Sequence, residues 1–112
     1  MKETILYRVS CSLSKKGWDE SLIEWKAIEK EKVYVITRDN GGELITRHIK
    51  KNEIGAINSA IHDIAHINFW ALCFEGEVDS LKIRLKEKVA KAAIGMRDAV
   101  TLLVNHIVIL LL

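Results

Sequence analysis

The predicted fold depends most on residues 78–112, which read VDSLKIRLKEKVAKAAIGMRDAVTLLVNHIVILLL. Its apolar side chains recur in steps of three, four and four residues, at Val78, Leu81, Leu85, Val89, Ala92, Met96, Val100, Leu103, Ile107 and Leu111. This eleven-residue rhythm is that of a nearly straight helix. We therefore expect one long C-terminal helix, which Gly95 either leaves whole or divides in two.

The last part of this predicted helix, residues 99–112, is apolar on nearly every side. Such a helix is buried in protein or in a membrane, and a membrane span needs about 18 to 20 apolar residues. Because Asn105 and His106 interrupt a shorter run, we expect no membrane span and predict burial between copies of the chain. The predicted oligomerisation residues are Met96, Val100, Leu103, Asn105, His106, Ile107 and Leu110. The two polar residues among them would fix the register of the bundle. A C-terminal membrane anchor is the alternative.

The composition fits a single domain of 112 residues, with a sheet mainly in residues 1–75 and the helix in residues 76–112. Hydrophobic residues make up 49% of the chain, and the excess is concentrated in the C-terminal segment. A net charge of +2 is too small to indicate nucleic-acid binding by itself. Cys11 and Cys73 are isolated in the sequence, and no signal peptide is visible, so we expect buried, reduced thiols in a cytoplasmic protein.

The first half of the chain has the pattern of antiparallel strands. Apolar and polar residues alternate through residues 5–13, which predicts a half-buried strand that ends in a turn at residues 14–17. Residues 18–29 fit either a strand or a helix, and the strand is favoured because the strand-like residues 33–37 follow almost at once. The run DNGG at residues 39–42 marks a tight turn that joins residues 33–38 to residues 43–50 as a hairpin.

The next segment is expected to leave the sheet and return to it. The spacing of Ile54, Ile57, Ile61 and Ile64 predicts a short helix, and residues 66–74 predict a further strand with both faces covered. The predicted fold class is therefore α+β, an antiparallel sheet of four or five strands followed by a long C-terminal helix that mediates oligomerisation.

Two histidines in this segment have the spacing of metal ligands. On a helix, His62 and His66 would lie on one face, as in the HExxH zinc proteases. Asp63 stands where that motif has glutamate, and no third ligand follows. We therefore predict no metal site, and a small metal-dependent hydrolase using these histidines is only the third functional hypothesis.

Basic and aromatic residues gather around the predicted hairpin. Arginine binds phosphate in a bidentate manner and aromatic rings stack on bases, so the group is a candidate site for a nucleotide, another phosphorylated ligand or a nucleic-acid strand. A charged sheet edge is the alternative interpretation. The candidate ligand-binding residues are Arg38, Arg47, His48, Lys50, Lys51, Trp25 and Tyr34. We predict no catalytic residues and no cofactor, because the chain has no glycine-rich phosphate loop, nucleophile elbow or adjacent Cys–His pair.

Several segments resemble those of small phage or prophage accessory proteins from Gram-positive hosts. They are EWKAIE at residues 24–29, YVI at residues 34–36 and RHIKKNEIG at residues 47–55, followed by an aromatic strand and one terminal helix. Some such proteins are anti-defence sponges that oligomerise and sequester the cyclic-nucleotide signals of host immunity, as in the Thoeris anti-defence type. The resemblance implies a similar role but assigns no binding residue.

Together these observations predict a non-enzymatic, oligomeric binding protein that sequesters a phosphorylated small ligand or a host protein. A nucleic-acid-binding accessory protein is the alternative.

Overall fold

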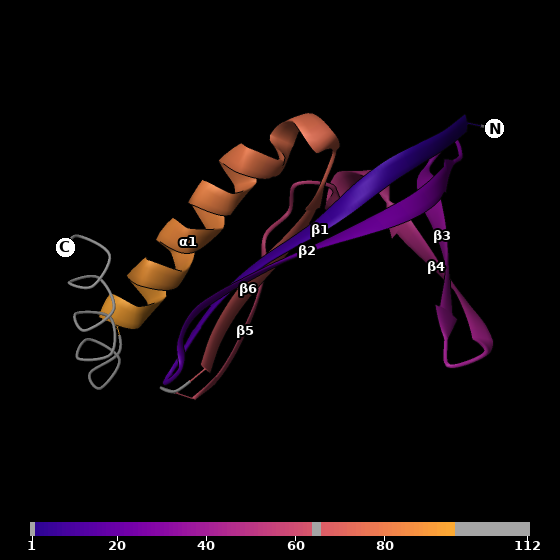
Figure 1. Ribbon diagram of the computed structural model, residues 1–112. Helices are drawn as coiled ribbons and strands as arrows, with labels where there is room; N and C mark the ends of the chain where they lie inside the picture. The colour runs from indigo at the N-terminus through magenta and orange to yellow at the C-terminus, as the bar shows by residue number, and fades with distance from the viewer. Residues whose placement is uncertain (1, 64–65, 96–112) are drawn as a thin grey trace.

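The chain folds into a six-stranded antiparallel sheet followed by one helix, an α+β arrangement (Figure 1). The computed structural model describes residues 2–63 and 66–95. The elements are β1 (Lys2–Ser14), β2 (Gly17–Glu29), β3 (Val33–Asn40), β4 (Glu43–Lys50), β5 (Asn58–Asp63), β6 (His66–Cys73) and α1 (Val78–Ile94), with short 3-10 turns η1 (Lys51–Glu53) and η2 (Glu75–Glu77). The strand order is β4-β3-β2-β1-β6-β5, so the first four strands form a meander and the β5–β6 hairpin adds to the free side of β1.

The strands predicted from period-two alternation are confirmed, including the ambiguous segment that forms β2. The predicted turn between β3 and β4 is also present. Gly41 and Gly42 have φ values of 68° and 93°, and the N–H of Gly42 donates to Oδ1 of Asp39 over 2.9 Å. Positive φ is costly for other residues, so the two glycines allow this tight connection.

The predicted helix over residues 54–64 is wrong, and the strand count of four or five was too low for the same reason. Residues 58–63 form β5, which pairs with β6. The isoleucine spacing is compatible with a helix, but Gly55 has a φ of 83° and Ile54 instead bridges to Leu72. β6 offers β5 a row of unpaired backbone groups, and this tertiary pairing overrides a weak helical pattern.

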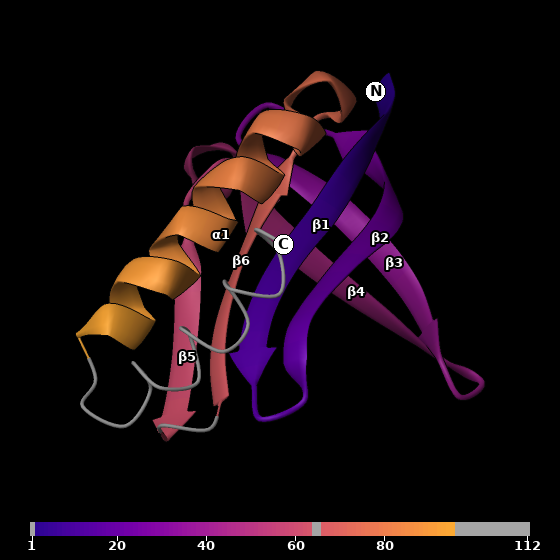
Figure 2. The same cartoon turned by 60° about the vertical axis from the view of Figure 1, so that its left-hand side comes forward.

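A first hydrophobic core lies between α1 and the sheet, where the helix crosses β1 and β6 (Figure 2). Its fully buried residues are Val9, Cys11, Leu13, Ile67, Ala71, Cys73, Leu81, Leu85, Val89 and Ala93. The predicted helical stripe is confirmed at Leu81, Leu85 and Val89. α1 ends at Ile94, and the N–H of Gly95 donates to the carbonyl of Lys91. Residues 96–112, which include every predicted oligomerisation residue, lie outside the described part of the chain.

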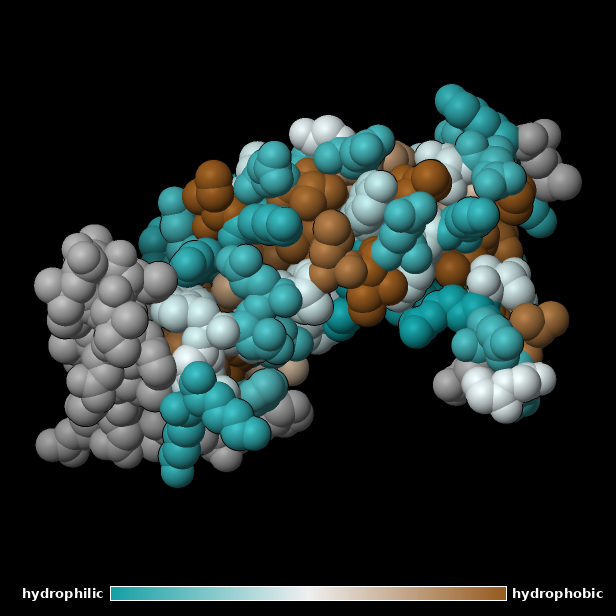
Figure 3. Space-filling view, in the orientation of Figure 1, coloured by the Kyte–Doolittle hydropathy of each residue, from teal (hydrophilic) through white to brown (hydrophobic). Residues whose placement is uncertain are grey.

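A second hydrophobic core lies on the opposite face of the sheet. It contains Leu6, Trp25, Ala27, Tyr34, Ile36, Ile49 and Leu72. It forms because the sheet curls. β3 pairs with β2 only through Ala27–Glu29, and beyond that point the β3–β4 hairpin swings away from the β1–β2 ribbon (Figures 1 and 2). In Figure 3 this hairpin projects from the body as an arm. The helix-free face of the sheet is therefore concave.

Over residues 2–63 and 66–95, no helix has the length and apolar character needed to cross a bilayer.

Candidate functional site

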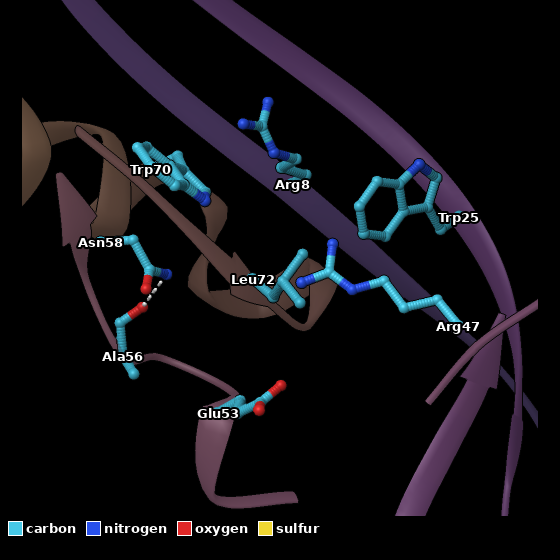
Figure 4. Close-up of a pocket in the computed structure, with 8 residues that line it drawn as sticks. All are labelled: Arg8, Trp25, Arg47, Glu53, Ala56, Asn58, Trp70 and Leu72. Carbon is cyan, nitrogen blue, oxygen red and sulfur yellow. Dashed lines mark hydrogen bonds between the residues drawn. The ribbon is translucent and has the colours of Figure 1, made fainter. Parts of the chain in front are cut away.

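The concave face contains a cavity of about 170 Å³ (Figure 4). Its lining residues come from five strands and the connection between β4 and β5, and they are Arg8, Trp25, Arg47, Glu53, Ala56, Asn58, Trp70 and Leu72. The strand register explains why they meet. Arg8 is paired with Leu72, and Asn58 is paired with Trp70, so these side chains share one face of the sheet.

Two arginines from distant parts of the sheet reach this cavity. Arg8 lies on β1 and Arg47 on β4, and Figure 4 shows the guanidinium group of Arg47 next to Leu72 and that of Arg8 on the side towards Trp70. The Cζ atom of Arg8 lies 5.5 Å from the centroid of the Trp70 ring, which is cation–π distance. A third arginine, Arg38, lies with its Cζ atom 5.1 Å from the Trp25 ring.

Three arginines on or beside this face carry positive charge that the described residues do not neutralise with ion pairs. Among residues 2–63 and 66–95, Arg8, Arg38 and Arg47 have no carboxylate within ion-pair distance. Partial burial lowers the pKa of Arg8 from its usual range, and the positive charges of Arg38 and Arg47 lower it further. An anion placed between these groups would therefore relieve an electrostatic repulsion.

The other lining residues give the cavity an apolar wall and one negative charge. Trp25 and Leu72 are only 6% and 8% exposed and form an apolar wall. Glu53, in η1, brings a carboxylate to the rim, and the side-chain amide of Asn58 donates to the carbonyl of Ala56 over 3.4 Å, as Figure 4 shows. The cavity thus combines two guanidinium groups, one carboxylate and two indole rings.

The structure brings together only some of the predicted ligand-binding residues. Arg47 and Trp25 line the cavity, and Arg38 stacks on Trp25 beside it. His48 and Lys50 lie on the other face, because their neighbours Arg47 and Ile49 pair with Ile36 and Tyr34 on the concave face.

The two remaining predicted residues belong to the second core and its rim. Tyr34 is 7% exposed and packs in that core. Lys51 covers it, with Nζ 5.6 Å from the ring centroid, and the same Nζ makes a 3.0 Å ion pair with Glu29. This lysine is therefore already engaged within the protein.

The sequence interpretation missed Arg8, Glu53, Asn58 and Trp70. Arg8 lies on the concave face of β1, where it is the register partner of Leu72. The missing information was that β6 and β5 pair on the far side of β1, because this pairing brings Trp70 and Asn58 next to Arg8. The spacing of residues along the chain does not predict that register.

The histidine pair does not have the geometry on which the metal hypothesis depended. Residue 62 lies on β5 and His66 on β6, where Asp63 and His66 are register partners, so the two histidines do not share a helix face. The side chain of residue 62 lies outside the described part of the chain. Within that part, no group of three or more His, Cys, Asp or Glu residues is arranged to hold a metal ion.

The two cysteines belong to the first core and not to the cavity. Both are free thiols, with Cys11 1% and Cys73 0% exposed. Burial raises the pKa of Cys11 to about 11, with a further contribution from the charge of Glu20. Burial also raises the pKa of Cys73. Thiols of this kind are poor nucleophiles at neutral pH.

Comparison of the chain with models of known protein families, with curated proteins and with solved structures finds no match.

Proposed function

We propose that this is a non-enzymatic binding protein that holds the phosphate or carboxylate group of a small ligand in the concave cavity. The observation that carries the proposal is the meeting of Arg8 and Arg47 at one cavity, with no carboxylate of the described residues in ion-pair distance. Guanidinium groups bind phosphate and carboxylate through paired N–H donors, and a site partly shielded from water strengthens such bonds.

The size of the cavity narrows the class of ligand. At about 170 Å³ it is smaller than the roughly 300–1,000 Å³ of typical ligand pockets. It can therefore hold the charged group of a ligand and a small flat part of the ligand against Trp70. The rest of a larger ligand would extend over the concave face. A phosphorylated small molecule fits this description, and Glu53 would accept a hydrogen bond from a donor on it.

Replacing Arg47 with alanine should weaken ligand binding. Loss of hydrogen bonds between charged groups costs about 1.5–3 kcal/mol, so we expect the affinity to fall roughly 10-fold to 100-fold. Isothermal titration with inorganic phosphate, pyrophosphate and adenosine monophosphate would measure the change. Arg47 is exposed at the edge of the sheet, so Arg47→Ala should fold normally.

The matched control is Arg84→Ala, which removes the same charge from the exposed surface of α1. It should bind the probes like the unaltered protein. Equal losses in the two variants would indicate a general charge effect, and an unchanged affinity of Arg47→Ala would refute the assignment of the site.

A nucleic-acid strand is the alternative ligand. The observation in its favour is that Arg8, Arg38 and Arg47 stand on three different strands of the same concave face. Salt dependence separates the two possibilities, because the affinity for a strand that contacts several phosphates falls steeply as salt rises. Tight oligonucleotide binding with a steep salt slope would favour this alternative over the small ligand.

We also propose that the protein is oligomeric and that residues 99–112 join the copies. The support is the sequence, because each exposed large apolar side chain forgoes about 1.5–3 kcal/mol of burial energy. If Asn105 specifies the register of the assembled helices, Asn105→Leu should change the number of subunits. Light scattering coupled to size-exclusion chromatography would detect it, and an unchanged mass would argue against that role.

The anti-defence role implied by the resemblance would combine these two properties, a ligand site and an assembly that concentrates it. Support for that role would come from native mass spectrometry of protein taken from cells, which reports the subunit count and any retained phosphorylated molecule together.

A further inference from the structure

Among residues 2–63 and 66–95, no strand pairs with most of the outer edge of β2. β2 has 13 residues, but β3 pairs only with Ala27, Ile28 and Glu29. Within the described part of the chain, no strand pairs with Gly17–Lys26 on the side away from β1. Leu22 and Ile23, in the middle of this free edge, are 47% and 38% exposed. The edge therefore presents unpaired backbone groups to solvent.

The register with β1 shows which residues present those groups. In an antiparallel pair, successive residues direct their N–H and C=O groups alternately to one neighbour and to the other. Ser14 and Gly17 close the two-residue β1–β2 turn and face each other, so alternate residues from Gly17 bond to β1. The residues between them, which include Glu20, Leu22 and Glu24, direct their backbone groups outward.

There is space beside this edge for another strand. Where β3 leaves β2, a hollow of about 470 Å³ opens between them. Its lining includes Ile23, Glu24 and Lys26 from β2 and residues 36–39 from β3. Trp25 also lines it, and the Nε1 atom of this 6% exposed residue has no hydrogen-bond partner among the described residues.

The charge of the edge selects the partner. Residues 17–26 contain the carboxylates Asp19, Glu20 and Glu24 against the single cation Lys26, a net charge of −2. None of these three carboxylates forms an ion pair within the described part of the chain. Arg38 and Asp39, across the hollow, cancel each other. A second copy of the same edge carries the same negative charge, so self-pairing of β2 is opposed.

We propose that the free edge of β2 binds an extended peptide segment of another protein by antiparallel strand addition. The segment carries two lysine or arginine residues four positions apart, opposite Glu20 and Glu24, with an apolar residue midway between them opposite Leu22. Main-chain hydrogen bonds supply the binding, and the alternation of acidic and apolar residues supplies the selectivity. This interaction is separate from the anion site on the concave face.

The test uses the full-length protein and a synthetic peptide with two lysines four residues apart, to lie opposite Glu20 and Glu24, and valine midway between them, to lie opposite Leu22. The matched control peptide has the same sequence with N-methyl groups on the residues whose N–H groups would face β2. It keeps the charge but cannot complete the ladder. We expect saturable binding of the first peptide and none of the second. Equal binding of the two peptides would mean that charge attraction alone holds them, and it would overturn the proposal. Failure of both peptides to bind would overturn it as well.

Hydrogen exchange locates the contact. Bound peptide should slow exchange at the amides of Glu20, Leu22 and Glu24, while the amides of Ser21 and Ile23, already bonded to β1, should not change. Uniform slowing along the strand, or slowing elsewhere only, would contradict strand addition.

Two variants complete the design. Replacing Glu20 and Glu24 together with glutamine should weaken peptide binding about fivefold, whereas Glu43→Gln on β4 should not affect it. Leu22→Pro removes an outward N–H and should abolish binding while leaving the β1–β2 ladder intact. If Leu22→Pro instead abolishes self-association, the edge is occupied by a second copy and the proposal is wrong.

Discussion

Leu85→Ala should lower the free energy of unfolding by about 2–5 kcal/mol, the range found when a buried leucine is truncated. Leu85 is 0% exposed and lies at the centre of the helical stripe that faces β1 and β6. Truncation removes its buried methyl groups and leaves a cavity between the helix and the sheet. Because small domains are stable by only about 5–15 kcal/mol, such a loss is a large fraction of the total.

Ile83→Ala is the matched control for this prediction. Ile83 lies on the same helix two residues earlier, but it is 62% exposed, so its truncation should change the stability by no more than about 0.5 kcal/mol. Urea unfolding followed by circular dichroism would measure both variants. Similar effects of the two substitutions would mean that the helix does not pack on the sheet by the face described here.

The second large effect is a loss of stability in alkaline solution. The ordinary pKa of a cysteine thiol is 9.0, and burial raises the pKa of Cys11 to about 11 in the folded protein. Between these two values the unfolded chain releases a proton that the folded chain retains, so unfolding becomes more favourable as the pH rises. The free energy of unfolding therefore keeps its full value below pH 9 and falls by roughly 2–3 kcal/mol as the pH rises towards 11.

Lysines and tyrosines titrate in part of the same range, so the control must isolate the thiols. Cys11→Ala and Cys73→Ala combined should reduce the slope of stability against pH between pH 9 and 11, whatever the effect of the substitutions on absolute stability. Urea midpoints measured across this range for both proteins would give the comparison. Parallel profiles would show that the thiols do not contribute.

Local patterns were sufficient for much of the fold. Alternation through β1 and β2 and the turn at residues 39–42 identify structures that depend on neighbouring residues, and the fold contains them. β5 could not be identified in this way. Its conformation depends on the backbone of β6, and isoleucines spaced three and four apart look helical until that partner is known.

The same distinction explains how much of the candidate site could be predicted. Arg47 and Trp25 were found because they belong to a cluster of basic and aromatic residues in one region of the sequence. Arg8 and Trp70 are far apart in the sequence, and only the pairing of β1 with β6 brings them together. His48 and Lys50 were grouped with Arg47 but lie on the other face of β4, because sequence proximity does not say which face a strand residue occupies.

The narrow attachment of the β3–β4 hairpin has a mechanical consequence. Only three residue pairs join this hairpin, which carries Arg47, to β2, so bending at these pairs would move Arg47 relative to the rest of the sheet. Arg8 lies on β1, so a ligand that binds both Arg8 and Arg47 would hold the β3–β4 hairpin in one position relative to the rest of the sheet. Occupancy would then stiffen the hairpin, because whatever binds one closed geometry stabilises it at the expense of the others.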